Sequence, residues 1–149
     1  MSPDTSIDET TLRAVEAGAR LARHLERTLA QADLTLPQFR LLLHLERGTD
    51  VASELARKAQ IKPPSLTALV DGLASRSLVQ RTPDENDRRR VHLAITPAGV
   101  TALAEGRRVA AKRLVELAKG RDSSPNPEIV ETLAGWVDLL DAWRDAHLQ

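Results

Sequence analysis

Residues 62–77, KPPSLTALVDGLASRS, have the pattern of a short helix that buries one stripe of its surface. Apolar side chains recur at the i, i+3, i+4 and i+7 spacing of such a stripe, at Leu66, Leu69, Val70 and Leu73. Two prolines begin the segment, where a missing N–H costs little and φ is already suited to a helix. The opposite face carries only small or hydroxyl-bearing residues, namely Ser65, Thr67, Ala68 and Gly72. A helix with this slim, uncharged face can approach another surface closely.

The segments on either side of this helix predict a winged helix-turn-helix. Residues 51–62, VASELARKAQIK, read as a shorter helix with Val51, Leu55 and either Ala59 or Ile61 facing inward. Two short helices joined by a tight turn form a helix-turn-helix. Residues 78–81 and 90–95 alternate like strands, and the polar tip TPDENDRR between them has the composition of a hairpin.

Longer helices are predicted at both ends of the chain, so the fold class is mainly α. Apolar periodicity indicates helices over residues 9–31, 97–119 and 127–147, and Thr35 and Thr96 are suited to cap the helices that follow them. We therefore divide the chain into residues 1–34, a winged helix-turn-helix over 35–96, and residues 97–149.

The two terminal helices carry more apolar surface than one small domain needs. A two-fold homodimer with intertwined terminal helices would cover it, whereas the alternative is an intramolecular helical subdomain. The candidate dimerisation residues are Leu12, Val15, Ile129, Leu133, Trp136, Leu140 and Trp143.

Composition narrows the function classes. The 149-residue chain has 21 basic and 21 acidic residues, which argues against indiscriminate binding of polyanions. Residues 57–92 nevertheless hold eight cations and four anions, a local charge of +4. The chain has no cysteine, which excludes a thiol switch. With no signal peptide and no long apolar run, we expect a soluble, cytoplasmic protein.

Several segments in order resemble the MarR family of transcription regulators. The run SLVQRTPDENDRRRVHLAITPAG, residues 77–99, resembles the family's wing and the opening of the long helix after it. Residues 54–79 resemble its helix-turn-helix, and LTLPQFRLLLHL, residues 34–45, its second helix. Two residues depart from the family pattern: Ser77 replaces a usual Gly and Ala68 a common Arg. The resemblance implies a winged helix-turn-helix dimer that binds double-stranded DNA.

The expected DNA contacts lie at the start of the central helix and on the wing. They are Lys62, Pro63, Pro64, Ser65, Thr67, Ala68, Arg81, Arg88, Arg89 and Arg90. The resemblance assigns minor-groove insertion to Arg89, and we expect Asp87 to shape the hairpin by pairing with Arg89 or with an arginine of the scaffold. Alternatively, the tip is a solvated turn whose charges keep a strand edge soluble. Asp71 would repel phosphate, so we expect it to face the wing or pair with a neighbouring cation.

The resemblance also implies a site for small aromatic or lipophilic effectors between the dimer helices and the winged unit. Its candidate residues are Arg20, His24, Phe39, Leu43, His44, Arg107 and Arg108, each of which has an ordinary surface or core role as the alternative.

No pattern in the sequence predicts catalysis, a cofactor or a metal site, because the four histidines are scattered singly. We therefore expect no enzyme but a homodimeric, effector-released repressor of a pseudo-palindromic operator. The rival hypotheses are a DNA-binding architectural protein without an effector and a helical interaction module that has lost DNA binding.

Overall fold

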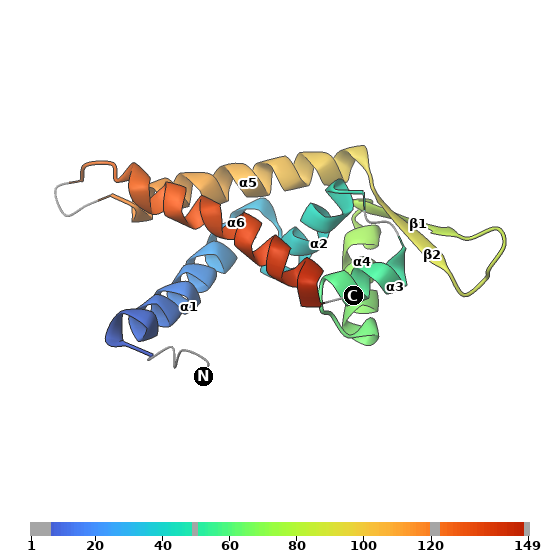
Figure 1. Cartoon of the computed structure of the whole chain (residues 1–149). Coiled ribbons are helices and arrows are strands. Elements are labelled where there is room, and N and C mark those ends of the chain that lie inside the picture. Colours follow the sequence, from blue (N-terminus) through green and yellow to red (C-terminus); the bar gives the residue numbers. More distant parts are fainter. Residues whose placement is uncertain (1–6, 49–50, 120–122, 148–149) are drawn as a thin grey trace, which may run out of the picture.

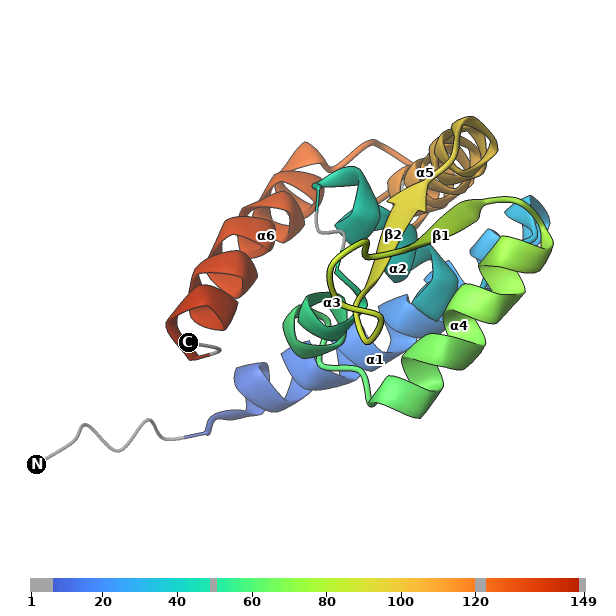
Figure 2. The same ribbon diagram turned by 90° about the vertical axis from the view of Figure 1, so that its right-hand side faces the viewer.

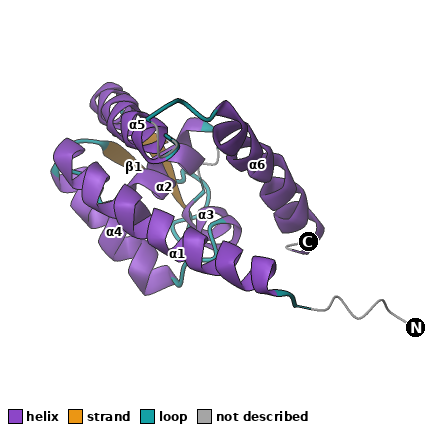
Figure 3. Cartoon of the chain, turned by 90° about the vertical axis from the view of Figure 1, so that its left-hand side faces the viewer, coloured by secondary structure: helices purple, strands orange, loops and turns teal. Residues whose placement is uncertain are grey.

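The computed structural model describes residues 7–48, 51–119 and 123–147, and the chain forms the predicted mainly helical winged fold (Figures 1 and 3). The elements are α1 (Glu9–Leu29), the 3-10 turn η1 (Ala30–Ala32), α2 (Leu36–Glu46), α3 (Ala52–Lys58), α4 (Pro63–Ser75), β1 (Val79–Pro83), β2 (Val91–Ile95), α5 (Pro97–Leu117) and α6 (Pro127–His147). Figure 1 shows α3, α4 and the hairpin at one end of the molecule, with α5 running from the hairpin to the other end.

The wing is an antiparallel hairpin in which Val79 pairs with Ile95 and Pro83 with Val91. Val51, just before α3, adds an antiparallel bridge to His92 and so attaches β2 to the helix-turn-helix. Only the base of the hairpin is buried, at Val79 and Leu93. The rest of the wing projects away from the core in Figure 1, and Figure 2 views the molecule from that end.

The core lies where α2, α3, α4, the hairpin base and the start of α5 meet. Its fully buried side chains are Leu29, Leu41, Leu42, Leu55, Leu73, Leu93 and Leu103. The predicted core stripe of α4 is confirmed: Leu66, Val70 and Leu73 are buried and Leu69 is half-buried. One predicted position is wrong, because Gly72 does not lie on the outer face. It is half-buried, and a Cβ there would meet Nε2 of Gln38 at 3.3 Å.

Helix caps fix the entry to α2 and α5, as predicted for both threonines. Thr35 forms a capping box with Gln38, in which each side chain bonds the other residue's backbone amide. Oγ1 of Thr96 accepts from the Gly99 amide at 3.0 Å and donates to the Ser77 carbonyl at 2.6 Å. Gly99 must lack a side chain, since a Cβ there would lie 2.1 Å from the Leu78 carbonyl oxygen. Together these contacts join the end of α4 to the start of α5.

Helix α4 ends in a turn that favours glycine but contains Ser77 at φ 57°. The Ser77 amide donates to the carbonyl of Ala74 and the Leu78 amide to that of Leu73, both at 2.9 Å. These two bonds satisfy carbonyl groups that the helix end would leave open. The left-handed backbone conformation of Ser77 strains this helix end, because a residue with a Cβ is disfavoured there.

The terminal helices contribute little to this core. Helix α6, whose residues are all described, has no buried residue, and only Thr28 and Leu29 at the end of α1 are buried. Within the described residues, no helix is long and apolar enough to cross a membrane.

Candidate nucleic-acid interface and effector site

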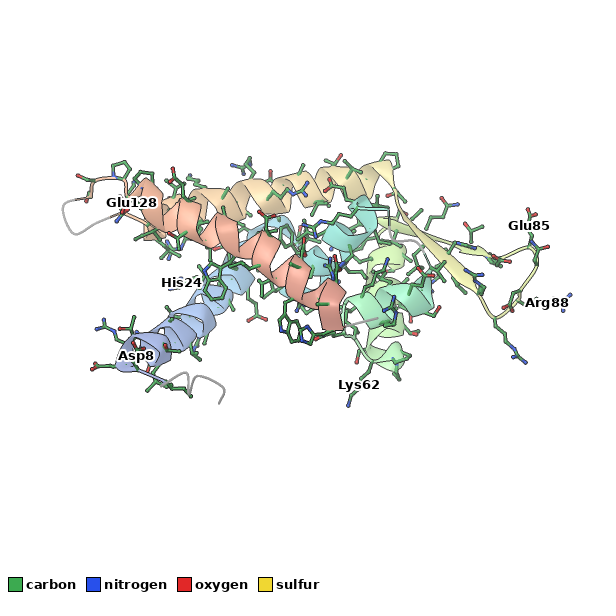
Figure 4. All side chains as sticks on the ribbon, in the orientation of Figure 1. Asp8, His24, Lys62, Glu85, Arg88 and Glu128 are labelled. Carbon is green, nitrogen blue, oxygen red and sulfur yellow. The ribbon has the colours of Figure 1, made fainter. Side chains whose placement is uncertain are left out.

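The first turn of α4 is open to solvent. Lys62, Pro63, Pro64 and Ser65 are all exposed, and no side chain caps the helix. Figure 4 shows Lys62 pointing away from the body of the molecule. This end of α4 can therefore meet a partner without moving any other part of the fold.

The two flanks of α4 have different neighbours. Thr67 and Asp71 face β1, where Arg81 contacts the Thr67 carbonyl at 3.5 Å and Oδ1 of Asp71 at 2.5 Å. The expectation that Asp71 faces the wing and pairs with a cation is thus confirmed. Ser65 and Ala68 lie on the other flank and line a hollow with the N-terminal turn of α2.

Two of the predicted contact side chains on the Asp71 flank already have intramolecular partners. The Thr67 hydroxyl donates to the Pro63 carbonyl at 3.1 Å. Arg81 is held by Asp71 and would have to leave this carboxylate to reach a phosphate. In the structure, the Asp71–Arg81 pair attaches α4 to β1 of the wing.

The wing tip is organised by Asp84. Its Oδ1 accepts from the backbone amides of Asn86 at 2.9 Å and Asp87 at 3.0 Å, and its Oδ2 lies 2.8 Å from Nε2 of His92. The His92 contact, followed by the two amides, lowers the pKa of Asp84 to about 2. Sequence reasoning missed the roles of Asp84 and His92. The signal for Asp84 was available, because an Asp at the start of a turn commonly accepts hydrogen bonds from the backbone N–H groups two or three residues later.

Asp87 shapes the tip through the backbone. Its Oδ1 accepts from the Arg89 amide at 2.9 Å, and its carbonyl oxygen accepts from the Arg90 amide at 2.9 Å. The carboxylate therefore meets the backbone of Arg89 rather than a guanidinium group.

The three wing arginines remain available. Arg88, Arg89 and Arg90 are exposed, and among the described residues their guanidinium groups have no hydrogen-bond or ion-pair partner. Figure 4 shows Arg88 at the far end of the hairpin, well away from the helical body.

The predicted effector residues do not form one cluster. Arg20 pairs with Glu16 on exposed α1, and His24 meets Arg113 of α5 at 3.4 Å. The ring of Phe39 packs against Gly106 in the interior.

The predicted arginines of α5 are engaged in ion pairs. Arg107 forms a bidentate ion pair with Glu46 of α2, with N–O distances of 2.8 and 2.5 Å. This pair lowers the pKa of Glu46 and raises the pKa of Arg107. Arg108 pairs with Glu105 one turn away on α5. Leu43 and His44 both line a groove between α2, the end of α3 and α6.

The predicted dimerisation residues are all exposed, and the five on α6 follow one another along a single apolar stripe. On α6, the side chains of Trp136, Leu140 and Trp143 are 53%, 60% and 56% exposed. Leu12, Val15, Ile129 and Leu133 are exposed as well. Within the described residues, no group of three His, Asp or Glu side chains could hold a metal ion.

The sequence matches a known protein family and several known transcription regulators. Residues 32–90 match the MarR family. The chain is 37% identical to the HTH-type transcriptional regulator FarR of Neisseria gonorrhoeae over 57% of this chain and 59% of the relative, so it covers less than two thirds of that relative's length. It is 32% identical to an uncharacterised HTH-type transcriptional regulator of Mycobacterium leprae over 65% of this chain and 68% of the relative.

Solved structures match over almost the whole chain. NadR in complex with 4-hydroxyphenylacetate aligns with a TM-score of 0.67 and 28% identity, over 97% of this chain and 98% of NadR. The transcriptional repressor CouR bound to a 23-mer DNA duplex aligns with a TM-score of 0.67 and 27% identity, over 93% of this chain and 97% of CouR. The chain therefore belongs to the MarR family of winged helix-turn-helix transcription regulators.

Proposed function

We propose that the protein is a homodimeric repressor that binds a pseudo-palindromic operator in the cytoplasm and is released by a small aromatic or lipophilic effector. The observation that carries this proposal is that one end of the molecule (Figure 1) exposes both the first turn of α4 and a wing tip whose arginines have no partner among the described residues. Relatives named as repressors, including NicR of Pseudomonas putida, support the direction of regulation.

Helix α4 is suited to the major groove because its exposed first turn is narrow and carries no acidic side chain. Ser65 can bond a phosphate or a base edge, and Pro64 and Ala68 can contact thymine methyl groups. No Arg, Asn or Gln lies on this face, so direct reading of bases is sparse. Specificity then depends on DNA shape and on the spacing of the two half-sites.

The wing supplies the minor-groove contact. A narrow minor groove has an enhanced negative potential that attracts arginine, and three exposed arginines at a hairpin tip fit this site. Asp87 holds the Arg89 backbone in place, so among the three we assign the insertion to Arg89. Lys62 and the remaining wing cations would contact phosphates.

A second copy of the chain would cover the stripe on α6. Helix α6 carries five acids against one arginine, while α5 carries four cations against two acids. Two intertwined chains could bury the apolar stripe of α6 between them. The acids of α6 in one chain could then pair with the cations of α5 in the other.

Replacement of Arg89 by Ala tests the DNA-binding proposal. We expect operator affinity to fall by about 1–3 kcal/mol, because a minor-groove cation is lost, while the melting temperature stays unchanged since the tip adds little stability. The measurement is a fluorescence anisotropy titration on an operator selected from random DNA. Glu85→Ala, at the same exposed tip, is the control and should not weaken binding. Equal affinity of the Arg89 variant and the wild type would remove Arg89 from the interface.

Charged substitutions on α6 test the dimer. Trp136→Asp combined with Leu140→Asp should convert the dimer to a folded chain of 16.3 kDa, because two half-exposed apolar side chains lose their partner surface. Sedimentation velocity measures the mass and circular dichroism the helicity. Ala134→Asp, on the opposite face of α6, should leave the dimer intact. A wild-type chain that sediments as a monomer would contradict the proposal.

A further inference from the structure

A hollow of ≈ 580 Å³ lies between the first turns of α2 and the flank of α4 that faces away from the wing. Ser65 and Ala68 line this hollow from α4, and Thr35, Gln38 and Arg40 line it from α2. Arg40 is the one charged residue in its walls. A cation that belongs to α2 therefore stands beside the open flank of α4.

The guanidinium group of Arg40 is available to a ligand. Arg40 is exposed, and among the described residues its side chain has no hydrogen-bond or ion-pair partner. The groove on the other side of Arg40 holds three more cations and one carboxylate, namely Lys58, Arg47, Arg144 and Asp141. Like charges therefore disfavour that side for Arg40 and leave its guanidinium to the hollow and the solvent beyond it.

Helix α4 cannot supply a cation on this flank itself. Its residues 63–75, PPSLTALVDGLAS, include no arginine or lysine. Lys62 lies before the first turn of α4, and Arg81 lies on the wing side, where Asp71 holds it. An anion on the flank away from the wing must therefore be met by the neighbouring helix α2.

Close packing fixes the position of α2 beside this flank. The Gln38 side chain accepts from the Thr35 amide at 3.1 Å, and a Cβ at Gly72 of α4 would meet its Nε2 at 3.3 Å. Arg40 follows Gln38 by two residues. Its backbone therefore has a set position relative to α4, and only its side chain has to move to reach a ligand.

The two flanks of α4 face different DNA strands if this helix enters the major groove, because a phosphate backbone bounds the groove on each side. The flank with Thr67 and Asp71 faces the wing. The flank with Ser65 and Ala68 faces the hollow and Arg40. A side chain that reaches out of the hollow would meet the strand on the side of α4 away from the wing.

We propose that Arg40 binds a backbone phosphate of the DNA on the side of α4 opposite the wing. Its guanidinium donates hydrogen bonds to the phosphate oxygens across the mouth of the hollow. This inference rests on the proposed function, because the phosphate belongs to the DNA that α4 enters. It adds α2 to the interface, so that each half-site is held from both of its strands, and it fixes position rather than sequence.

Replacement of Arg40 by Gln tests this contact in the full-length protein. Anisotropy titrations on the selected operator and on unrelated DNA should both show affinity lowered by a similar factor, about tenfold. The slope of log K against log salt should become shallower by about 2, because a dimer loses two phosphate contacts. Arg40→Lys keeps the charge and should keep the slope.

The matched control is Arg13→Gln, which removes the same charge from an exposed position on α1. Helix α1 begins at the end of the molecule opposite the hairpin (Figure 1), so this variant should change neither affinity nor slope. The melting temperature of Arg40→Gln should equal that of the wild type, since an exposed side chain without a partner adds little stability.

Ethylation of single phosphates, which removes their charge, locates the contact. In the wild type, ethylation of one phosphate per half-site, on the strand away from the wing, should reduce binding. Arg40→Gln should become insensitive to ethylation of that phosphate and stay sensitive at the phosphates beside the wing.

Three outcomes would overturn the Arg40 contact. With a wild type that binds its operator, unchanged affinity and slope in Arg40→Gln would remove the contact and leave the proposed function standing. A loss of affinity confined to the operator would mean that Arg40 reads a base and not a phosphate. A wild type that binds no DNA would overturn this contact and the proposed function together.

Discussion

At the hairpin tip, the Asp84 side chain holds the shape of the turn, whereas the side chains of the wing arginines are exposed to solvent. The Asp84 carboxylate bonds two successive amides and the His92 ring, and His92 bridges to Val51 before α3. The tip is thus connected to the helix-turn-helix through one acid and one histidine. Loss of this acid should change where the arginines point without removing any of them.

Replacement of Asp84 by Ala should weaken operator binding about tenfold, the scale of losing one wing contact. The reason is that the Asn86 and Asp87 amides lose their acceptor and the tip becomes mobile. Backbone NMR relaxation of the tip and anisotropy titrations measure the two effects. Glu85→Ala should change neither, and an ordered tip with full affinity in the Asp84 variant would show that the carboxylate is dispensable.

The same carboxylate makes the order of the wing depend on pH. The pKa of Asp84 is about 2 in the folded chain, below the value of roughly 3.9 for an unperturbed Asp. Its contribution is therefore fully present above pH ~4 and is lost as pH falls toward 2. The Asn86 and Asp87 amide signals should titrate with the folded value. A midpoint near 4 would mean that the His92 contact and the two amides do not act on the carboxylate in solution.

At the scale of elements, sequence patterns located the helices and the hairpin because these depend on local spacing and caps. The stripe of α4 and the threonine caps are of this kind. The effector residues were harder to place, since the partner of Arg107 is Glu46, sixty-one positions earlier in the chain. Asp84 was missed because residues 84–87 are three acids and one asparagine, each of which could accept a backbone hydrogen bond. Only the folded backbone determines that Asp84 accepts from the Asn86 and Asp87 N–H groups. The Gly72 contact with α2 likewise depends on how two helices pack.

Helix ends at Gln60 and Ser77 are both built from residues with positive φ, which allows a substitution that stabilises the chain. Ser77→Gly should raise the free energy of unfolding by about 1 kcal/mol, because glycine adopts this conformation without a Cβ penalty. Thermal unfolding should then shift upward by about 2–4 °C. Ser75→Gly is the opposite control: Ser75 is the last residue of α4, so glycine should lower stability slightly there because it only adds freedom to the unfolded chain. Equal effects of the two substitutions would show that Ser77 carries no strain.

The whole molecule has zero net charge, but its basic, acidic and apolar side chains lie on different parts of the surface. Among the described residues, arginines without a partner lie at the wing tip, five acids lie on α6, and the apolar stripe lies along the same helix. No residue of α6 belongs to the buried core, so this helix is open to a second chain. In the proposed dimer, a second chain that binds along α6 would set the distance between the two winged units.

That distance sets the form of the operator. A two-fold dimer presents two α4 helices to successive major grooves, so the half-site centres should lie about 10 bp apart or at a small multiple of this spacing. About six phosphate contacts per dimer, from Lys62 and the wing cations, should give a slope of log K against log salt of roughly −5.

Insertion of 5 bp between the half-sites turns one of them by about half a helical turn. A rigid dimer can then hold only one half-site, so affinity should drop toward the non-specific level. Insertion of a full turn should restore part of it if the dimer can stretch. Unchanged affinity after the half-turn insertion would mean that the two wings act independently and that the paired arrangement does not exist on DNA.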